Sequence, residues 1–397
     1  MRSTIKNSDS NRLYILSISL LAFSIPYENR YSNIALILSI ATSLFLIKKE
    51  SIKRVTSDYA WILLSMNILI FLTGIFLVEK SSIDNHFGKM GKYLLLLLVP
   101  LILHKTRNAK NQQIVLFGFC SGVIIGLLIC WFQLLFFEPS DAAISYSLFT
   151  QPIGGIHPVY LAQFVVMAFF ILFEAFLRND KLLYKITIVI FQIFLITSLI
   201  FLQSRTPIVA FMICLILYVF IKVFRQKIKK QLGYVAFILA FSSLFFLTAD
   251  TNSYLIIKDR LFNNFTDGLS LRFHSWSCAW RIFLENPKVF GIGFSNTQLF
   301  LDECYKNHYL ARPYFEHYNA HNQYLQILIA SGILGILSWL SMIGFGFYRA
   351  ISNNNVLSLI FLTLFSICCL TEVYLARIWG VLFYALFYSL LVIENKK

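Results

Sequence analysis

The stretch QIVLFGFCSGVIIGLLICWFQLLFF, residues 113–137, contains no charged side chain. A hydrocarbon core about 30 Å thick is crossed by roughly 17 to 25 apolar residues in a helix, so this stretch predicts a transmembrane helix. Similar runs recur along the whole chain, and we predict spans at about 13–27, 33–47, 59–78, 92–104, 113–137, 158–177, 186–203, 207–223, 233–248, 323–346, 356–370 and 379–393. The sequence therefore predicts an all-α integral membrane protein with about 12 transmembrane helices, forming one polytopic domain over residues 1–397.

Composition excludes a soluble enzyme. The 397 residues are 58% hydrophobic and 13% charged, whereas a soluble domain has about 25% charged residues. The net charge of +15 would point to nucleic acid if the basic residues formed one patch. They stand instead in short clusters between apolar runs, which is typical of cytoplasmic loops. We therefore expect membrane lipids as partners and no nucleic acid.

The lysines and arginines also orient the chain. Because cytoplasmic loops carry the excess of positive charge, the densely basic segments, such as residues 222–230, are assigned to the cytoplasm, together with both termini. The opposite short loops hold only Arg30, Lys80, Lys89, Lys92, Arg205 and Arg377. The segment 249–322 then lies outside, and it is the only connection long enough to fold by itself. Long loops of this kind are usually functional.

Within this loop, the segment Ser270–Glu285, SLRFHSWSCAWRIFLE, has a helical pattern. Leu271, Trp276, Trp280 and Phe283 recur at helical spacing, and Asn286–Pro287 ends the run. We interpret it as an amphipathic helix at the outer membrane interface, where tryptophan is enriched. The alternative is a helix that only packs the loop onto the bundle.

Two of the seven cysteines, Cys278 and Cys304, fall in this loop, and the others fall in apolar spans. An oxidising compartment would allow the two to form a disulfide. Their spacing alone does not show that their Cα atoms approach, so free thiols remain the alternative.

Cationic side chains on the outer side are the first candidates for chemistry. Arg205 stands in the turn Gln203–Pro207 between two apolar helices, where an arginine is costly unless it meets an anion or water. Arg272 stands in the amphipathic segment, and its guanidinium suits phosphate. Arg281, nine residues further on, falls on the opposite helical face. Snorkelling or simple solvation is the alternative for both candidates.

The segment His317–Asn322, HYNAHN, precedes the tenth span. His321 at the membrane mouth is a candidate general base, because an imidazole can take a proton from a hydroxyl near neutral pH. A metal pair with His317 is the weaker interpretation, since no third and fourth ligand stand beside them. A structural, hydrogen-bonded histidine is the main alternative.

Other patterns carry less information. Lys92 and the pair Glu372 and Arg377 lie at outer ends of spans, and His157 fits a turn-and-cap role at least as well as substrate contact. There is no GxxxxGK[ST], no HExxH and no CxxC pair. We therefore expect neither a metal nor another cofactor.

The order of motifs resembles the O-antigen ligase and polymerase superfamily. The matching features are Ser204–Arg205 in a short outer turn, Arg272, Trp276, the stretch 286–293 (NPKVFGIG), the stretch 320–325 (AHNQYL) and the stretch 331–335 (SGILG). The resemblance is strongest over residues 203–335.

This resemblance implies a GT-C-like helical fold with one long periplasmic loop in the bacterial inner membrane. It implies transfer of a glycan from undecaprenyl diphosphate to an acceptor sugar, for a ligase the outer core of lipid A-core, without a metal. Arg205 and Arg272 would hold the diphosphate, and His321 would be the base. Lys92 and Glu372 resemble positions that recur in some ligases. We also expect His317 and Asn319 to contact the substrate.

Two alternatives remain. An O-antigen polymerase uses the same carrier with a lipid-linked repeat as acceptor, but polymerases commonly carry two sizeable outer loops, whereas one is long here. A flippase or transporter would place polar residues near the bilayer midplane, whereas the clear buried acid is Glu174 near a cytoplasmic end. We therefore favour a ligase.

Overall fold

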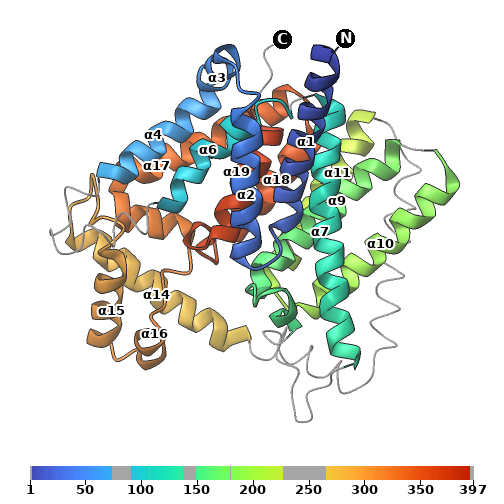
Figure 1. Cartoon of the computed structure of the whole chain (residues 1–397). Helices are drawn as coiled ribbons and strands as arrows, with labels where there is room; N and C mark the ends of the chain where they lie inside the picture. Colours follow the sequence, from blue (N-terminus) through green and yellow to red (C-terminus); the bar gives the residue numbers. More distant parts are fainter. Residues whose placement is uncertain are drawn as a thin grey trace. The chain divides into compact units, whose positions relative to one another are not determined.

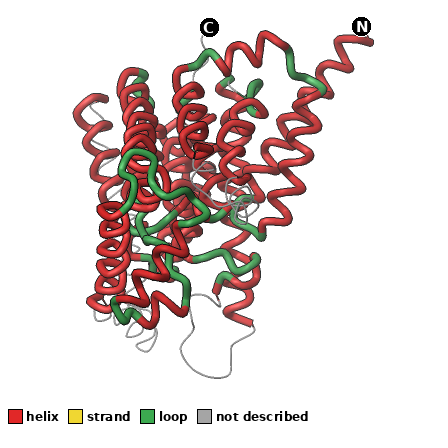
Figure 2. The backbone as a smooth tube through the Cα atoms, turned by 90° about the vertical axis from the view of Figure 1, so that its left-hand side faces the viewer, coloured by secondary structure: helices red, strands yellow, loops and turns green. Residues whose placement is uncertain are grey.

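A computed structural model describes residues 2–73, 91–106, 108–136, 149–178, 180–226 and 265–393. These residues form helices and loops, and no strand occurs among them (Figure 2). The all-α prediction is therefore confirmed for the described part of the chain. The chain divides into two compact units. The first comprises residues 1–47, 105–264 and 359–364. The second comprises residues 48–104, 265–358 and 365–397. The single domain over 1–397 stays a prediction.

The first unit consists of apolar helices that pack closely. Its helices are α1 (Arg2–Ser24), α2 (Asn29–Leu44), α7 (Ala109–Phe136), η4 (Gln151–Ile153), α9 (Pro158–Arg178), α10 (Leu182–Phe201) and α11 (Arg205–Gln226). Gly118 and Gly122 stand one turn apart on α7, and a Cβ at Gly122 would lie 2.1 Å from the carbonyl oxygen of Phe23 on α1. Small residues four apart allow this approach between membrane helices.

The second unit contains α3 (Lys49–Thr56), α4 (Tyr59–Thr73), η3 (Lys92–Leu94), α6 (Leu95–Ile102), α14 (Phe265–Glu285), α15 (Thr297–Asn307), α16 (Ala311–Phe315), α17 (Gln323–Ser352), η6 (Tyr374–Ala376) and α19 (Ile378–Leu391). The helix α18 (Val356–Cys368) contributes residues to both units. The helices α4 and α17 run side by side in Figure 1.

The long helix α17 is broken at Gly332, where φ is 64° and ψ is −159°. Backbone from residues 288–293 fills the break: Ile292 N and Gly293 N donate to the carbonyls of Ile329 and Ala330, each at 2.9 Å, and Ile333 N donates to Lys288 O at 2.8 Å. Irregular backbone is tolerated at membrane depth where the protein satisfies its hydrogen bonds. The stretches 286–293 and 331–335 therefore lie together at the break in α17.

Several helices have the length and apolarity of membrane spans. Among the described residues five qualify, namely α7, α9, α10, residues 205–222 of α11, and α17, and a sixth results if α2 and α3, bent by 119°, count as one. Shorter apolar helices occupy residues 59–72, 92–102, 356–368 and 378–391. The chain is thus a multi-pass membrane protein. The count of 12 stays a prediction, and the predicted span 233–248 lies outside the described residues.

The long loop folds around a small core of its own. Residues 249–264 lie outside the described part, and α14, α15 and α16 follow, with α15 beside α14 and α16 beside α15 (Figure 1). The core comprises Cys278, Ala279, Ile282, Ile292, Leu301, Cys304, Tyr305, Ala320 and Ile329. The last of these belongs to α17, so the loop is packed onto the start of that helix.

The helix α14 ends at Glu285, as predicted from Asn286–Pro287, and begins earlier than predicted, at Phe265. Its buried face carries mainly small residues, Ser275, Cys278 and Ala279, because these allow α15 to approach. Phe273 and Trp280 stay exposed on the other side. An exposed aromatic face is what an interfacial helix requires, so the position at the membrane interface stays our prediction.

Candidate functional site

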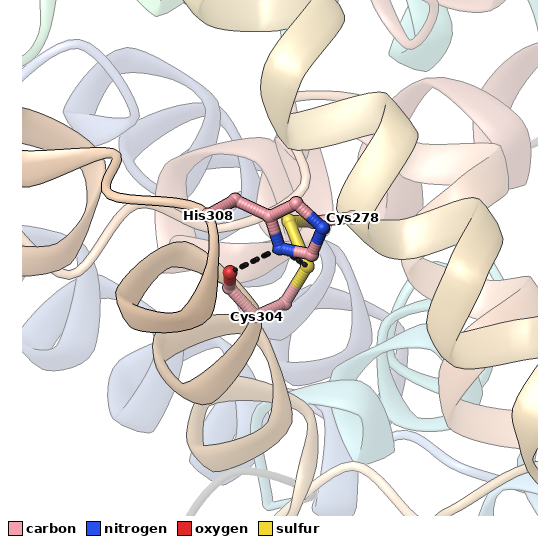
Figure 3. A group of neighbouring side chains, drawn as sticks. All are labelled: Cys278, Cys304 and His308. Carbon is pink, nitrogen blue, oxygen red and sulfur yellow. Dashed lines mark hydrogen bonds between the residues drawn. A yellow bond between two sulfur atoms is a disulfide. The ribbon is translucent and has the colours of Figure 1, made fainter.

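Cys278 and Cys304 form a disulfide that joins α14 to α15, with their Cα atoms 5.8 Å apart. The structure thus decides a question that the sequence left open. His308 lies against the disulfide, with its Nδ1 2.9 Å from the carbonyl oxygen of Cys304 (Figure 3). The Sγ atoms of both cysteines and one ring nitrogen of His308 lie within 4.8 Å of one another. A disulfide offers no thiolate to a metal, however, so in this oxidised form the group is a structural staple.

Arg281 is part of the same group, because its guanidinium donates to Nε2 of His308. This contact places Arg281 on the α15 side of α14. It therefore stands apart from Arg272 around the helix, as the sequence spacing predicts.

The segment 317–321 is a strained loop immediately before α17. His317 and His321 both adopt positive φ, 50° and 45°. Such a backbone conformation costs of order 1 kcal/mol for a residue with a side chain, and it persists only where the surroundings impose it. The surrounding structure therefore stabilises an unfavourable backbone conformation at both histidines.

Side chains from three helices impose this conformation by bonding to the loop's backbone. Their bonds are Trp276 Nε1 to His321 O at 3.2 Å, Gln298 Nε2 to Tyr318 O at 3.1 Å, Tyr305 Oη to Asn319 O at 3.3 Å and Ala320 N to Gln326 Oε1 at 3.2 Å. Because the backbone of a loop needs partners for its polar groups, these four side chains hold the loop in one conformation.

Tyr305 shows how firmly this support is built. Its ring is fully buried in the loop core, and burial raises the pKa of its hydroxyl to about 12. The hydroxyl therefore stays protonated and donates to the loop throughout the physiological pH range. Asn319 contributes from within the loop, since its Oδ1 accepts from the backbone N–H of His321 at 2.8 Å.

The side chain of His321 lies beside that of Glu372, which follows α18. The Nδ1 of His321 is 3.5 Å from Oε2 of Glu372, and the two side chains are 24% and 12% exposed. Tyr318 packs its ring edge-on against the imidazole. Nδ1 itself is buried and has no hydrogen-bond partner among the described residues. A buried polar atom of this kind requires an explanation, and the acceptor that lies beside Nδ1 is the Glu372 carboxylate.

The loop that carries Glu372 is tied to the start of α17 and to η3. Gln323 donates its backbone N–H to Cys369 O at 2.8 Å, and its Oε1 accepts from Leu375 N at 2.9 Å. Lys92 donates from Nζ to the carbonyl oxygen of Ala376. The structure thus brings Glu372 beside His321 and ties Lys92 to the loop that carries Glu372. Arg377 is exposed and Glu372 lies instead against His321.

Arg272 is half-buried on α14, one turn before Trp276. Residues four apart share a helix face, and the indole of Trp276 bonds to the carbonyl of His321. The guanidinium of Arg272 therefore belongs to the helix face that supports His321.

Arg205 and His157 belong to the first unit. Arg205 is the first residue of α11, after the tight turn at Gln203, whose φ is 51°. His157 precedes α9, and its Nδ1 accepts from Val159 N at 3.4 Å, which corresponds to the turn-and-cap interpretation. The role of Arg205 at the diphosphate stays a prediction.

Trp276 and Gln323 stand within the motifs that carry the resemblance, but no role at the site was predicted for them or for Gln326. The two glutamines had a readable signal, because they are polar residues three apart at the start of an apolar helix. Their side chains are buried and bind the loops that carry the candidate residues.

Comparison with known proteins identifies one family. Residues 190–340 match the family model of O-antigen ligase. The match covers less than half of the chain and includes Arg205, Arg272 and His321, but not Lys92 or Glu372. A search of the curated proteins finds no match. The resemblance predicted from the motifs at 203–335 is thereby confirmed.

Proposed function

We propose, on the premise that residues 190–340 form an O-antigen ligase domain, that the chain is an inner-membrane glycosyltransferase. It transfers a glycan from undecaprenyl diphosphate to the outer-core sugar of lipid A-core at the periplasmic face. The observation that carries the proposal is His321, held in a strained loop beside Glu372 with a buried Nδ1 that has no hydrogen-bond partner among the described residues.

His321 acts as the base. When Nδ1 carries its proton towards Glu372, Nε2 is left to take a proton from the acceptor hydroxyl. The acceptor oxygen then bonds to the anomeric carbon, and the bond between that carbon and the phosphate oxygen breaks with its electron pair leaving on the diphosphate. Attack opposite the leaving group inverts the anomeric centre. Glu372 orients the imidazole and stabilises its protonated form.

Arg272 and Arg205 bind the diphosphate. The leaving group gains negative charge as its bond to the sugar breaks, and fixed guanidinium groups stabilise that charge. Lys92 adds a third positive charge and holds the loop of Glu372 through the carbonyl of Ala376. These cations take the role that a metal ion has in other transferases, so we expect activity to persist in EDTA.

A transporter is less well supported. A transport mechanism would use the acid Glu174. Its Oε1 already accepts a hydrogen bond from the hydroxyl of Tyr218 and pairs with Nζ of Lys222, each at 2.8 Å. An acid with two such partners is committed to holding α9 against α11.

The test incubates the purified protein with undecaprenyl-diphosphate-linked glycan and lipid A-core, separately and together, and resolves the products on a gel. We expect product only with both substrates, and the same yield in EDTA. Chain growth on the carrier alone would identify a polymerase. The absence of covalent product with active reference ligase in parallel would contradict the proposal.

A further inference from the structure

A second pair of imidazole and carboxylate lies on the segment 317–321. The Nδ1 of His317 is 2.8 Å from Oδ2 of Asp302, which is carried by α15. This pair is closer than that of His321 and Glu372, and it differs in exposure, since the side chain of His317 is 69% exposed and that of Asp302 is 18% exposed. An imidazole thus faces solvent while its carboxylate partner is sheltered.

The pair is part of a connected set of hydrogen bonds. Gln298, one turn before Asp302 on α15, donates from Nε2 to Oδ1 of Asp302 at 2.9 Å and to the carbonyl of Tyr318 at 3.1 Å. One amide therefore fixes both the carboxylate and the backbone next to His317. With positive φ at His317 in addition, the imidazole is held by its backbone and by its partner.

This arrangement presents one ring nitrogen to a ligand. When Nδ1 donates to Asp302, Nε2 becomes an acceptor for a hydroxyl group. The exposed position suits a hydrophilic group that projects into water, whereas the polyprenyl chain of the carrier stays in lipid. Sugar hydroxyls are such ligands.

The spacing connects this group to the reacting centre. His317 and His321 are four residues apart, so their Cα atoms are at most about 14 Å apart. An oligosaccharide of a few sugars spans such a distance, with one hydroxyl at His321 and another at His317.

We propose that His317, oriented by Asp302 and Gln298, forms a subsite for a hydroxyl of the acceptor saccharide. The assignment rests on the proposed function, in which His321 deprotonates the acceptor. His317 binds the acceptor in both ground and transition states, and Asp302 and Gln298 are positioning residues.

The kinetic test compares His317→Ala and Asp302→Asn with wild type, varying lipid A-core and lipid-linked glycan separately. Lost ground-state binding raises KM with kcat unchanged. We expect KM for lipid A-core to rise about tenfold, with kcat and the KM for the donor within about twofold of wild type. Glu303→Gln is the matched control, because it removes an exposed carboxylate next to Asp302 on α15, and it should match wild type.

A binding test separates this inference from the proposed function. Lipid A-core is titrated into the purified full-length protein without donor, and its Kd is measured together with the thermal stability of each variant. We expect weaker binding in both variants at unchanged Tm. The two ideas can fail separately. If wild type binds lipid A-core and His317→Ala weakens that binding, while neither wild type nor any variant transfers glycan, the proposed function fails and the subsite stands.

Three results would overturn the subsite. They are acceptor affinity equal to wild type in both variants, an effect confined to kcat or to the donor, and a loss of Tm that accounts for the whole effect. The last would show that the pair only holds the loop.

Discussion

Two pairs of ionisable side chains in the second unit differ in how closely their partners are bonded. Asp58 and Arg349 lie near the ends of α4 and α17 that we predict to be cytoplasmic. Nη1 of Arg349 is 2.7 and 2.9 Å from the two oxygens of Asp58 and 2.9 Å from the carbonyl of Val392. His321 and Glu372 are 3.5 Å apart, and Nδ1 of His321 has no hydrogen-bond partner among the described residues.

The difference separates a structural pair from a functional one. A charge pair with its hydrogen bonds complete gains nothing from a ligand, and losing one partner leaves a buried charge. In the second pair, the loop at positive φ holds Nδ1 of His321 towards Glu372, and in the proposed function Nε2 is then left for the acceptor hydroxyl. The first pair should therefore govern stability, and the second should govern activity.

The sharpest test of this contrast is His321→Ala. Loss of the base should lower kcat by roughly 10²- to 10⁴-fold, while Tm stays close to wild type because the imidazole makes no hydrogen bond through Nδ1. Initial rates and thermal unfolding in the same detergent measure both. His274→Ala, which removes an exposed imidazole from α14, is the control. Wild-type activity in His321→Ala would show that His321 is not the base.

The opposite outcome is expected for Asp58→Ala. Removing one partner of a buried pair costs about 3–5 kcal/mol, so Tm and the yield of folded protein should fall. The exposed pair Arg30 and Glu28, 2.8 Å apart, serves as comparison, and Glu28→Ala should cost less than about 1 kcal/mol. Equal stability of the two variants would show that the buried pair contributes no more to stability than the exposed one.

The disulfide tests how far the stability of the protein depends on the link between α14 and α15. Cys278→Ser with Cys304→Ser removes a staple across 26 positions of sequence, and chain entropy predicts a loss of about 2–4 kcal/mol. Thermal unfolding with and without reductant should show wild type falling to the level of the variant. A wild type that reductant leaves unchanged under conditions that open the disulfide would contradict this role.

The smallest effect concerns Glu316. Hydrogen bonds from Tyr318 and Arg312 lower the pKa of this exposed carboxyl. A carboxyl with a lowered pKa in the folded state contributes stability above its unfolded pKa, about 4.3, and loses it as pH falls through the folded value. The difference in Tm between wild type and Glu316→Gln should be slight at pH 7 and vanish as the pH falls below the folded pKa. A difference that grows on acidification would have the wrong sign.

Much of the fold follows from local pattern. The apolar runs predict helices because a bilayer requires backbone groups to be satisfied within each span, and α7, α9 and α10 follow the predicted spans closely. The end of α14 at Glu285 follows from Asn286–Pro287. The break at Gly332 did not follow, because its hydrogen-bond partners lie about forty residues earlier in the chain.

The sequence by itself determined the membrane class, the long loop and the candidates Arg272 and His321, since hydropathy, charge and residue type are local properties. Only the tertiary structure decided that Cys278 bonds to Cys304, that Glu372 lies beside His321 and that Asp302 orients His317. These pairings join residues that are 15 to 51 positions apart. Their approach depends on how helices pack, which no local pattern encodes.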